Sequence, residues 1–357
     1  MHKLLTVVGV VASIVLVSAA GQQPELKAKH LAAGDLTPAL RVTKWLQGHE
    51  IKEFAAGKIY VVDFWATWCD PCIAVMPQIS RLQKEYREKG VSFIGFTALD
   101  EKDNTLEKVT LFVSKRGPKL GYSFAYSEDR ATYDTWIASA KRTIPCSFVI
   151  GKDRKIAFVG HPMFLGEVLP KVVAGTWVKA DVESMAKVEA EVMVIFNSLS
   201  GSNAEEGLNA LLEFQKKHPL LSGIPYFISP RIRLLLLSKK EDEARKIADE
   251  AIAKAIESDD TIMLSKVSAI LRSPEVSMNR AILALSLKSA EAWLKIAGDK
   301  DMFALWNLAE SHFALGDKMK AREYGAKAIA ATNNESGEVE KYIQQQIKRF
   351  DEEKKDK

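Results

Sequence analysis

The spacing of apolar and polar positions changes about half-way along the chain. In the first half, short apolar runs alternate with stretches in which apolar residues recur every three or four positions. The run at 58–65 predicts a buried strand, and the spacing over 72–86 predicts an amphipathic helix. Further strands are expected at 91–97, 122–126, 147–150 and 155–159, and helices at 106–115 (closed by Gly117-Pro118), 131–138 and 165–173. Strands and helices that alternate and then end in a hairpin and a last helix indicate an α/β layer with a mixed sheet.

From about residue 180 onward the strand pattern disappears, and alanine, leucine, lysine and glutamate dominate. The clearest unit lies at 305–329, where small residues and a Gly316-Asp317 turn allow two antiparallel helices to pack closely. This spacing is typical of a tetratricopeptide hairpin, which repeats every ~34 residues. A weaker copy lies at 228–252 and a degenerate hairpin at 262–296. The alternative is a plain helical bundle without repeats.

The first residues resemble an export signal. Met1-His2-Lys3 is a short basic start, and the apolar run that follows, 4–17, is shorter than the ~20 residues of a membrane span. Small residues follow at 17–20, where a signal peptidase would cut. We therefore expect export to the periplasm or another extracytoplasmic location, with an uncleaved membrane anchor as the alternative.

These patterns divide the chain into five segments. They are a signal peptide (1–20), an α/β domain (24–178), a helical linker (179–220), tetratricopeptide-like repeats (221–335) and a charged helical tail (336–357). The end of the tail, from Arg349, is nearly all charged, so we expect it to be solvated.

Composition and charge narrow the function classes. Of 357 residues, 47% are hydrophobic and 27% charged, as in ordinary globular proteins. The net charge is only +4 and no arginine-rich block occurs, so nucleic acid is not an expected partner. Three cysteines are too few for a disulfide scaffold.

Two of these cysteines, Cys69 and Cys72, lie between the predicted strand and the predicted helix. Cys69 therefore stands at a helix N-terminus, where unpaired N–H groups and the helix dipole favour a thiolate. Two intervening residues let one turn bring both sulfurs together. Cys69 is the expected nucleophile and Cys72 the resolving thiol. Pro71 is tolerated at a helix start. The alternatives are a zinc site or two structural thiols, but no second Cys-x-x-Cys and no histidine spacing supports a metal site.

Asp63 is anomalous because it interrupts an apolar strand. Burial without a partner would raise its pKa and suit it to proton exchange with Cys72. The alternative is an aspartate on an edge strand that faces water.

The string VVDFWATWCDPC closely resembles the active-site segment of thioredoxins. Pro77 and Thr143-Ile144-Pro145 strengthen the match. The segment GDLTP (34–38) and Gly160-His161-Pro162 resemble the exported TlpA/ResA-type thiol–disulfide reductases of the redoxin group. The resemblance covers about residues 30–178 and implies a thioredoxin-like fold.

The resemblance also implies roles for single residues. Pro145 would be a cis-proline that faces the disulfide and exposes the backbone of Ile144 to substrate. Asp63 would be the buried acid beneath the disulfide, and Trp68 and Pro71 would support the active site. No cofactor is implied beyond a redox-active Cys69–Cys72 disulfide.

Two residues depart from the family pattern. Asp70 follows Cys69 where glycine is commonest, and Ile73 replaces a frequent basic residue. Both changes remove positive potential near the sulfurs, so a reducing poise is expected. Cys146, beside Pro145, is either an inert buried thiol or a modulator that exchanges with Cys69 or completes a three-sulfur copper site.

The sequence thus predicts an exported thiol–disulfide oxidoreductase. Its expected partners are protein disulfide substrates, a membrane or soluble electron donor, and a protein docked on the helical repeats, so that truncation near residue 179 would leave small-substrate reduction intact. A non-catalytic scaffold and a copper-handling relative remain as alternatives.

Overall fold

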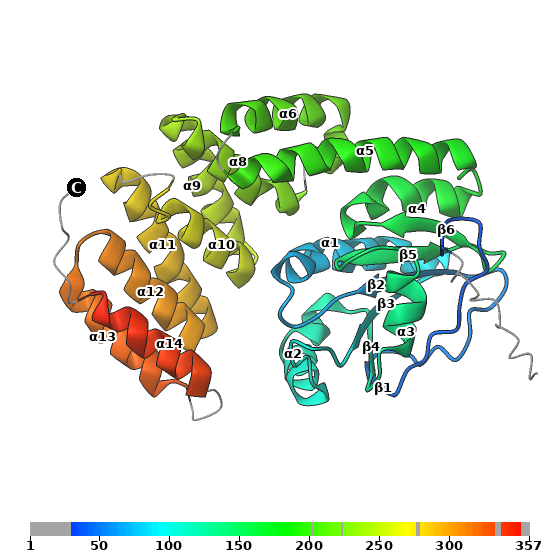
Figure 1. Cartoon of the computed structure of the whole chain (residues 1–357), viewed down its shortest axis with the longest axis horizontal. Helices are drawn as coiled ribbons and strands as arrows, with labels where there is room; N and C mark the ends of the chain where they lie inside the picture. Colours follow the sequence, from blue (N-terminus) through cyan, green and yellow to red (C-terminus); the bar gives the residue numbers. More distant parts are fainter. Residues whose placement is uncertain (1–29, 201–202, 223, 276–278, 333–336, 351–357) are drawn as a thin grey trace, which may run out of the picture.

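The computed structural model describes residues 30–200, 203–222, 224–275, 279–332 and 337–350. The predicted signal peptide lies outside these residues. Within them, no helix is both long and apolar enough to cross a membrane. The chain builds an α/β domain followed by a region made only of helices in its described residues (Figure 1).

The α/β domain is organised around one six-stranded mixed sheet with the order β1-β4-β3-β2-β5-β6. The strands are β1 (Lys44–Gln47), β2 (Ile59–Phe64), β3 (Val91–Ala98), β4 (Ser123–Ser127), β5 (Cys146–Ile150) and β6 (Ile156–Gly160). β2 pairs in parallel with β3 and antiparallel with β5, so it is a central strand. All six of its residues are buried, which explains why the strand is apolar except at Asp63.

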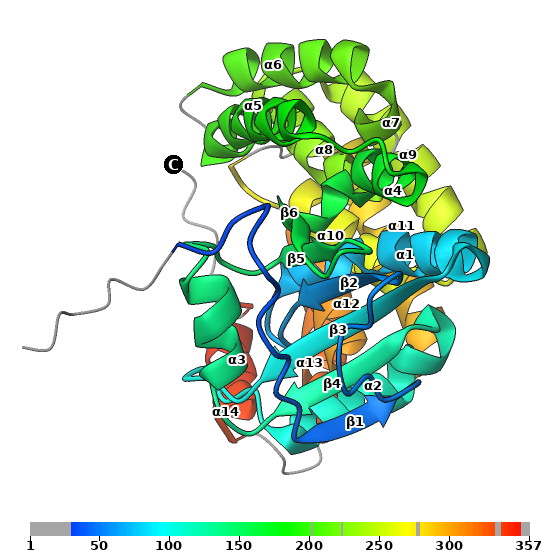
Figure 2. The same cartoon turned by 90° about the vertical axis from the view of Figure 1, so that its right-hand side faces the viewer.

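Helices cover both faces of the sheet. The helical segments are α1 (Asp70–Tyr86), η1 (Arg87–Lys89), α2 (Leu106–Leu120), α3 (Ala131–Tyr133), η2 (Asp134–Ala138), η3 (Pro162–Phe164) and α4 (Leu165–Ala174). Apolar residues of α1, α2 and α4 share one buried cluster with one face of β2, whereas Trp136 and Ile137 of η2 join the cluster on the other face. Figure 2 shows α3 on the opposite side of the sheet from α2.

One helix is longer than its sequence predicts. The helix expected at 106–115 runs on through Gly117-Pro118 and ends only at Gly121, which has φ 75°. The side chain of Gln47 donates to the carbonyl of Gly117 (2.8 Å), and a Cβ at Gly117 would collide with that side chain. Gly117 therefore serves close packing against β1 and does not stop the helix.

The second half consists of paired helices. They are α5 (Lys179–Asn197), η4 (Ser198–Ser200), α6 (Ala204–Lys217), α7 (Pro219–Ser222), η5 (Pro225–Phe227), α8 (Ile228–Leu237), α9 (Glu241–Glu257), α10 (Thr261–Leu271), α11 (Arg280–Ala297), α12 (Met302–Ala314), α13 (Lys318–Ala330) and α14 (Gly337–Lys348). The three predicted hairpins correspond to α8–α9, α10–α11 and α12–α13. The predicted linker is itself helical, since it contains α5 and α6.

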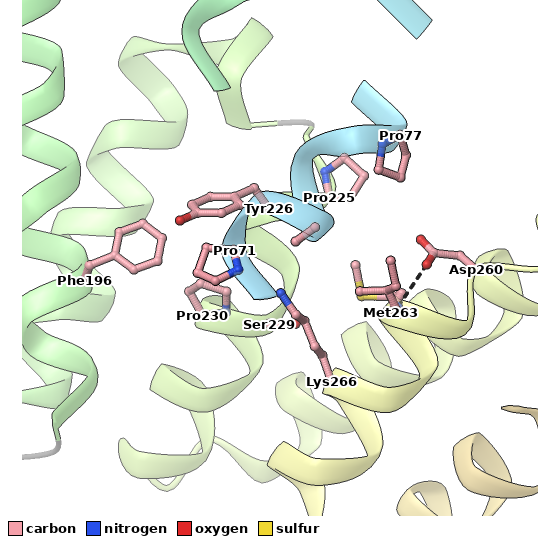
Figure 3. A pocket seen from close by; sticks show the side chains of 12 residues that line it. Pro71, Pro77, Phe196, Pro225, Tyr226, Ser229, Pro230, Asp260, Met263 and Lys266 are labelled. Carbon is pink, nitrogen blue, oxygen red and sulfur yellow. Dashed lines mark hydrogen bonds between the residues drawn. The ribbon is translucent and has the colours of Figure 1, made fainter. Parts of the chain in front are cut away.

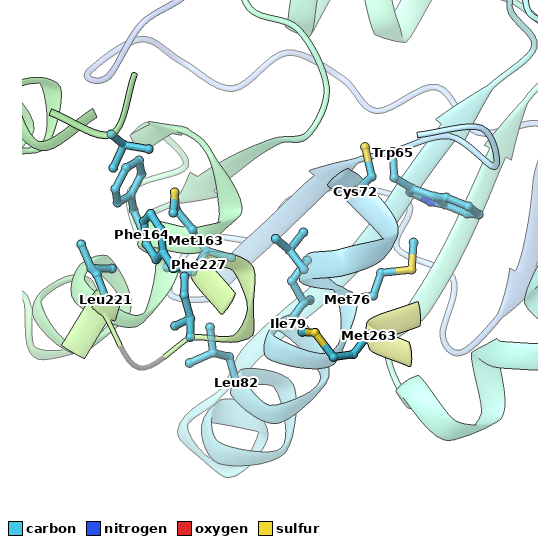
Figure 4. Close-up of a cluster of buried hydrophobic side chains, with 14 of the residues drawn as sticks. Trp65, Cys72, Met76, Ile79, Leu82, Met163, Phe164, Leu221, Phe227 and Met263 are labelled. Carbon is cyan, nitrogen blue, oxygen red and sulfur yellow. The ribbon is translucent and has the colours of Figure 1, made fainter. Parts of the chain in front are cut away.

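The helical region packs onto the α/β domain through a shared apolar core. Ile79 and Leu82 of α1 belong to the same buried cluster as Phe227 and Met263 of the helical region (Figure 4). α10 also contacts α1 directly. The two halves therefore share one continuous core along α1.

The prediction of a solvated tail from Arg349 is wrong at Phe350, whereas Arg349 itself is exposed. Phe350 is fully buried, with its ring stacked on Trp306 (centroids 5.8 Å apart) and close to Phe313 (4.7 Å). Arg349 pairs with Glu310. Residues 351–357 lie outside the described residues.

Candidate active site

Cys69 and Cys72 are joined by a disulfide at the N-terminus of α1, with their Cα atoms 5.3 Å apart. Cys69 is the N-cap residue, and its Sγ accepts from the N–H of Cys72 (3.3 Å). Pro71 occupies the first helical turn, where its missing N–H is harmless. Cys69 is 3% exposed and Cys72 0%. After reduction, the helix N-terminus would stabilise a thiolate at Cys69.

Asp63 lies in β2, with its side chain on the α1 face of the sheet, since Val61 of the same face belongs to the cluster that holds Cys72. The edge-strand alternative is therefore wrong. The expectation that Asp63 lacks a partner is wrong for one oxygen: Oδ1 accepts from the hydroxyl of Ser147 on β5 (2.6 Å), while Oδ2 has no partner among the residues that the structure describes. Burial raises the pKa of Asp63 to about 7, and the Ser147 hydrogen bond opposes the rise.

The Ile144–Pro145 peptide bond is cis, and both residues are half-buried. They directly precede β5, whose first residue, Cys146, pairs with Phe64. Cys146 belongs to the apolar cluster on the opposite face of the sheet from Cys72.

This placement separates Cys146 from the disulfide. Its side chain is 1% exposed, and burial raises the pKa of its thiol. The inert alternative fits these surroundings, and a three-sulfur copper site does not. Within the described residues, no group of three His, Cys, Asp or Glu side chains is arranged to hold a metal ion.

Trp68 forms an exposed edge of the site. It is 39% exposed, its Nε1 donates to Asp100 Oδ2 (2.8 Å), and the Nζ of Lys102 lies 3.8 Å from its ring centroid. The loop after β3 therefore holds the indole in place.

A buried asparagine that the sequence analysis missed organises this loop. Asn104 Oδ1 accepts from the backbone N–H (3.0 Å) and the hydroxyl (2.7 Å) of Thr67, two residues before Cys69. Asn104 Nδ2 donates to Thr97 Oγ1 (2.8 Å), whose hydroxyl donates to the carbonyl of Trp65 (2.5 Å). The network ties the active-site turn to the end of β3. An asparagine in a polar loop gave no sequence signal for it.

The helical region also reaches the active site in two places. Nη1 of Arg142, just before the cis-proline loop, donates to both carboxylate oxygens of Glu189 on α5 (2.9 Å each). Lys266 of α10 lies with its Nζ 3.5 Å from the carbonyl oxygen of Asp70. Neither contact could be predicted, because the partners are 47 and 196 residues apart.

His161 lies where the two halves meet. Its Nδ1 accepts from the N–H of Met163 (3.1 Å), and its ring is 4.8 Å from that of Tyr226. Burial lowers the pKa of His161 to about 3, so the ring is neutral near pH 7 and adds no charge to the site.

Comparisons with known proteins agree with this geometry. The redoxin family model matches residues 32–166. Protein FixW of Rhizobium leguminosarum is 31% identical over 164 residues, which cover 45% of this chain and 74% of FixW. The chain belongs to the redoxin family. The thiol-disulfide oxidoreductase ResA of Bacillus cereus (strain ATCC 10987 / NRS 248) is 33% identical over 132 residues, 36% of this chain and 70% of ResA.

Other relatives are matched over shorter stretches. ResA of Bacillus anthracis is 35% identical over 107 residues, 30% of this chain, so the chain spans about half of that relative (56%). A solved thiol-disulfide isomerase from Corynebacterium glutamicum is 20% identical, with a TM-score of 0.32 over 38% of this chain and 96% of that chain. The redoxin match ends at residue 166, so the tetratricopeptide interpretation of the helical region stays a prediction.

Proposed function

We propose that this redoxin is an exported thiol–disulfide oxidoreductase that reduces protein disulfides through Cys69 and Cys72. One observation carries the proposal most: the disulfide caps α1 above a central strand in which Asp63 is buried, with its pKa raised to about 7. A group with that pKa both takes up and gives up protons near neutral pH. An inert disulfide would not need such a carboxyl group beneath it.

The proposed reaction has two exchange steps. The Cys69 thiolate attacks one sulfur of a substrate disulfide, which forms a mixed disulfide and releases one substrate thiolate. Asp63 then accepts the proton of the Cys72 thiol. The Cys72 thiolate attacks the Cys69 sulfur, which closes the Cys69–Cys72 disulfide and releases the second substrate thiolate. Two electrons pass to the substrate, and an electron donor outside the protein restores the dithiol.

Other residues near the disulfide would bind substrate or hold the active-site turn in place. The backbone of Ile144, before Pro145, would pair with an extended substrate segment. Trp68, Pro71 and the Asn104 network would hold the turn that carries Cys69. Export is supported by the sequence of residues 1–20, and it would place the site where substrate disulfides form.

The test is reduction of insulin by the full chain with dithiothreitol as donor, followed by turbidity. We expect wild type to accelerate precipitation, and we expect Cys69→Ser to abolish that acceleration. Asp299→Asn, a substitution of an exposed residue that keeps all three cysteines, serves as the control. No acceleration by wild type would reject the oxidoreductase and favour the scaffold; copper bound per chain without insulin reduction would favour the copper-handling relative.

A further inference from the structure

A pocket of about 130 Å³ lies between α1 and the helical region. Its lining includes Pro71 and Pro77 of α1, Tyr226 and Pro230 of the helical region, and Met263 of α10 (Figure 3). Since Pro71 belongs to the active-site turn, the pocket adjoins the disulfide. Its volume is on the scale of one side chain and well below the ~300–1,000 Å³ of small-molecule and cofactor sites.

Two polar groups at this pocket have unused hydrogen-bonding capacity. Ser229 Oγ is buried, and within the described part of the chain it has no hydrogen-bond partner. A buried hydroxyl without a partner is unfavourable, so a polar group that reached Ser229 from the pocket would gain a hydrogen bond. The ammonium of Lys266 has three donors, and among the described residues its one hydrogen bond is the long 3.5 Å approach to the Asp70 carbonyl.

The charges around Lys266 leave it available for an anion. Burial lowers its pKa, while Asp70 and Asp260 raise it. Asp260, which also lines the pocket, is the N-cap of α10, where its Oδ1 accepts from the N–H of Met263 (3.0 Å). Among the described residues that line the pocket, Lys266 is the one cation, so a carboxylate that entered the pocket would pair with it.

We propose that this pocket is a subsite that binds the substrate residues next to the substrate's disulfide. This proposal rests on the proposed function. It takes one apolar side chain against Pro71, Tyr226 and Met263, and a neighbouring carboxylate pairs with Lys266. The hydroxyl of Ser229 bonds to a backbone group of the same segment. The helical region would thus form one wall of the active site and select substrates there.

The experiment uses the reduced full chain and synthetic peptides with one cysteine disulfide-bonded to 5-thio-2-nitrobenzoate. One peptide carries Leu and Glu beside the cysteine, and a second carries Ser and Lys. Each exchange forms one Cys69–Cys72 disulfide and releases one coloured thiolate and one peptide thiol. We expect wild type to react about tenfold faster with the Leu-Glu peptide, the factor expected for partial burial of a leucine side chain.

Substitutions then test the assigned contacts. Lys266→Glu should favour a Leu-Lys peptide over a Leu-Glu peptide, opposite to wild type, and Lys266→Gln should remove the charge preference. Ser229→Ala should slow both peptides a few-fold. Lys254→Glu, an exposed charge reversal on α9 outside the pocket, is the matched control. Ratios between peptides are compared, so a change in thiol reactivity cancels.

The outcomes separate this inference from the proposed function. Equal rates for all peptides with an active wild type would overturn the subsite while leaving the oxidoreductase intact, as would an unchanged charge preference in Lys266→Glu. No release of thiolate from any peptide would overturn both. The subsite is supported if wild type prefers the Leu-Glu peptide, Lys254→Glu keeps this preference and Lys266→Glu reverses it.

Discussion

Replacing Asp63 with asparagine should change how stability depends on pH. In the unfolded chain the carboxyl group has its ordinary pKa of 3.8, whereas burial raises the folded value to about 7. Between these values the folded state binds a proton that the unfolded state has lost, so stability falls as pH rises. The whole difference corresponds to on the order of 4 kcal/mol, fully present below pH 4 and lost once pH passes 7.

Between pH 5 and pH 8 the wild type should therefore lose roughly 2 to 3 kcal/mol that Asp63→Asn does not lose. Asparagine keeps the oxygen that accepts from Ser147 but adds an amide donor without a partner, a penalty of about 1–3 kcal/mol that does not depend on pH. The variant should thus be equal to or less stable than wild type at pH 5 and more stable at pH 8.

The assay is urea denaturation of the oxidised protein at both pH values, with the exposed Asp299→Asn as the matched control. Near pH 7 the same Asp63→Asn variant should reduce disulfides at least tenfold more slowly, since its amide cannot accept the Cys72 proton. A stability difference between wild type and Asp63→Asn that stays constant from pH 5 to 8 would refute the buried, protonated carboxyl group. An unchanged rate would refute its part in catalysis.

Three further outcomes are expected. Cys72→Ser should accumulate mixed disulfides with substrate proteins, whereas Cys69→Ser should not; equal trapping in both variants, seen on non-reducing gels, would reverse their assignment. Cys146→Ala should leave insulin reduction unchanged, and the native thiol should alkylate only as fast as the chain unfolds, because it is buried on the far face of the sheet; a Cys69–Cys146 bond in mass spectra would contradict this. Asn104→Ala should lower stability by about 2 kcal/mol or more in thermal denaturation, because it leaves the buried groups of the active-site turn unpaired; an unchanged melting temperature would show that water replaces the amide.

The α/β half could be predicted because its signals are local. The fully buried central strand is apolar except at Asp63, and an amphipathic helix shows apolar residues with a period of 3.6. The helix end at Gly117-Pro118 was predicted wrongly because the local sequence does not show the contact of Gly117 with Gln47, 70 residues away. The burial of Phe350 was missed for the same reason, because this single aromatic residue in a charged stretch is buried only by residues of α12 and α13.

The candidate site was predictable where its residues adjoin one another in sequence. Cys69, Pro71 and Cys72 lie in one turn, so their spacing determines their geometry. Ser147 and Asn104 come from other strands and loops, and only the sheet register brings Ser147 opposite Asp63. Ordinary polar residues at such positions have no pattern that distinguishes them.

The packing of the helical region changes the expected effect of removing it. The sequence favoured an independent docking module, so that removal near residue 179 would leave small-substrate reduction intact. Ile79 and Leu82 of α1 are buried in the same cluster as Phe227 and Met263, and removal would expose them. A chain ending at residue 178 should therefore be less stable and prone to aggregate, which light scattering would detect.

The electrostatic potential at the active-site turn also depends on the helical region. Asp70 and Ile73 suggested a turn without positive potential, and hence a reducing poise. The fold places the ammonium of Lys266 3.5 Å from the Asp70 carbonyl, so a cation does stand beside the turn, contributed by a helix 196 residues away. A nearby cation favours the thiolate, and a stabilised thiolate makes the disulfide more oxidising. We therefore expect the redox poise of this protein to depend on how α10 packs against α1, and so on the packing of the helical region.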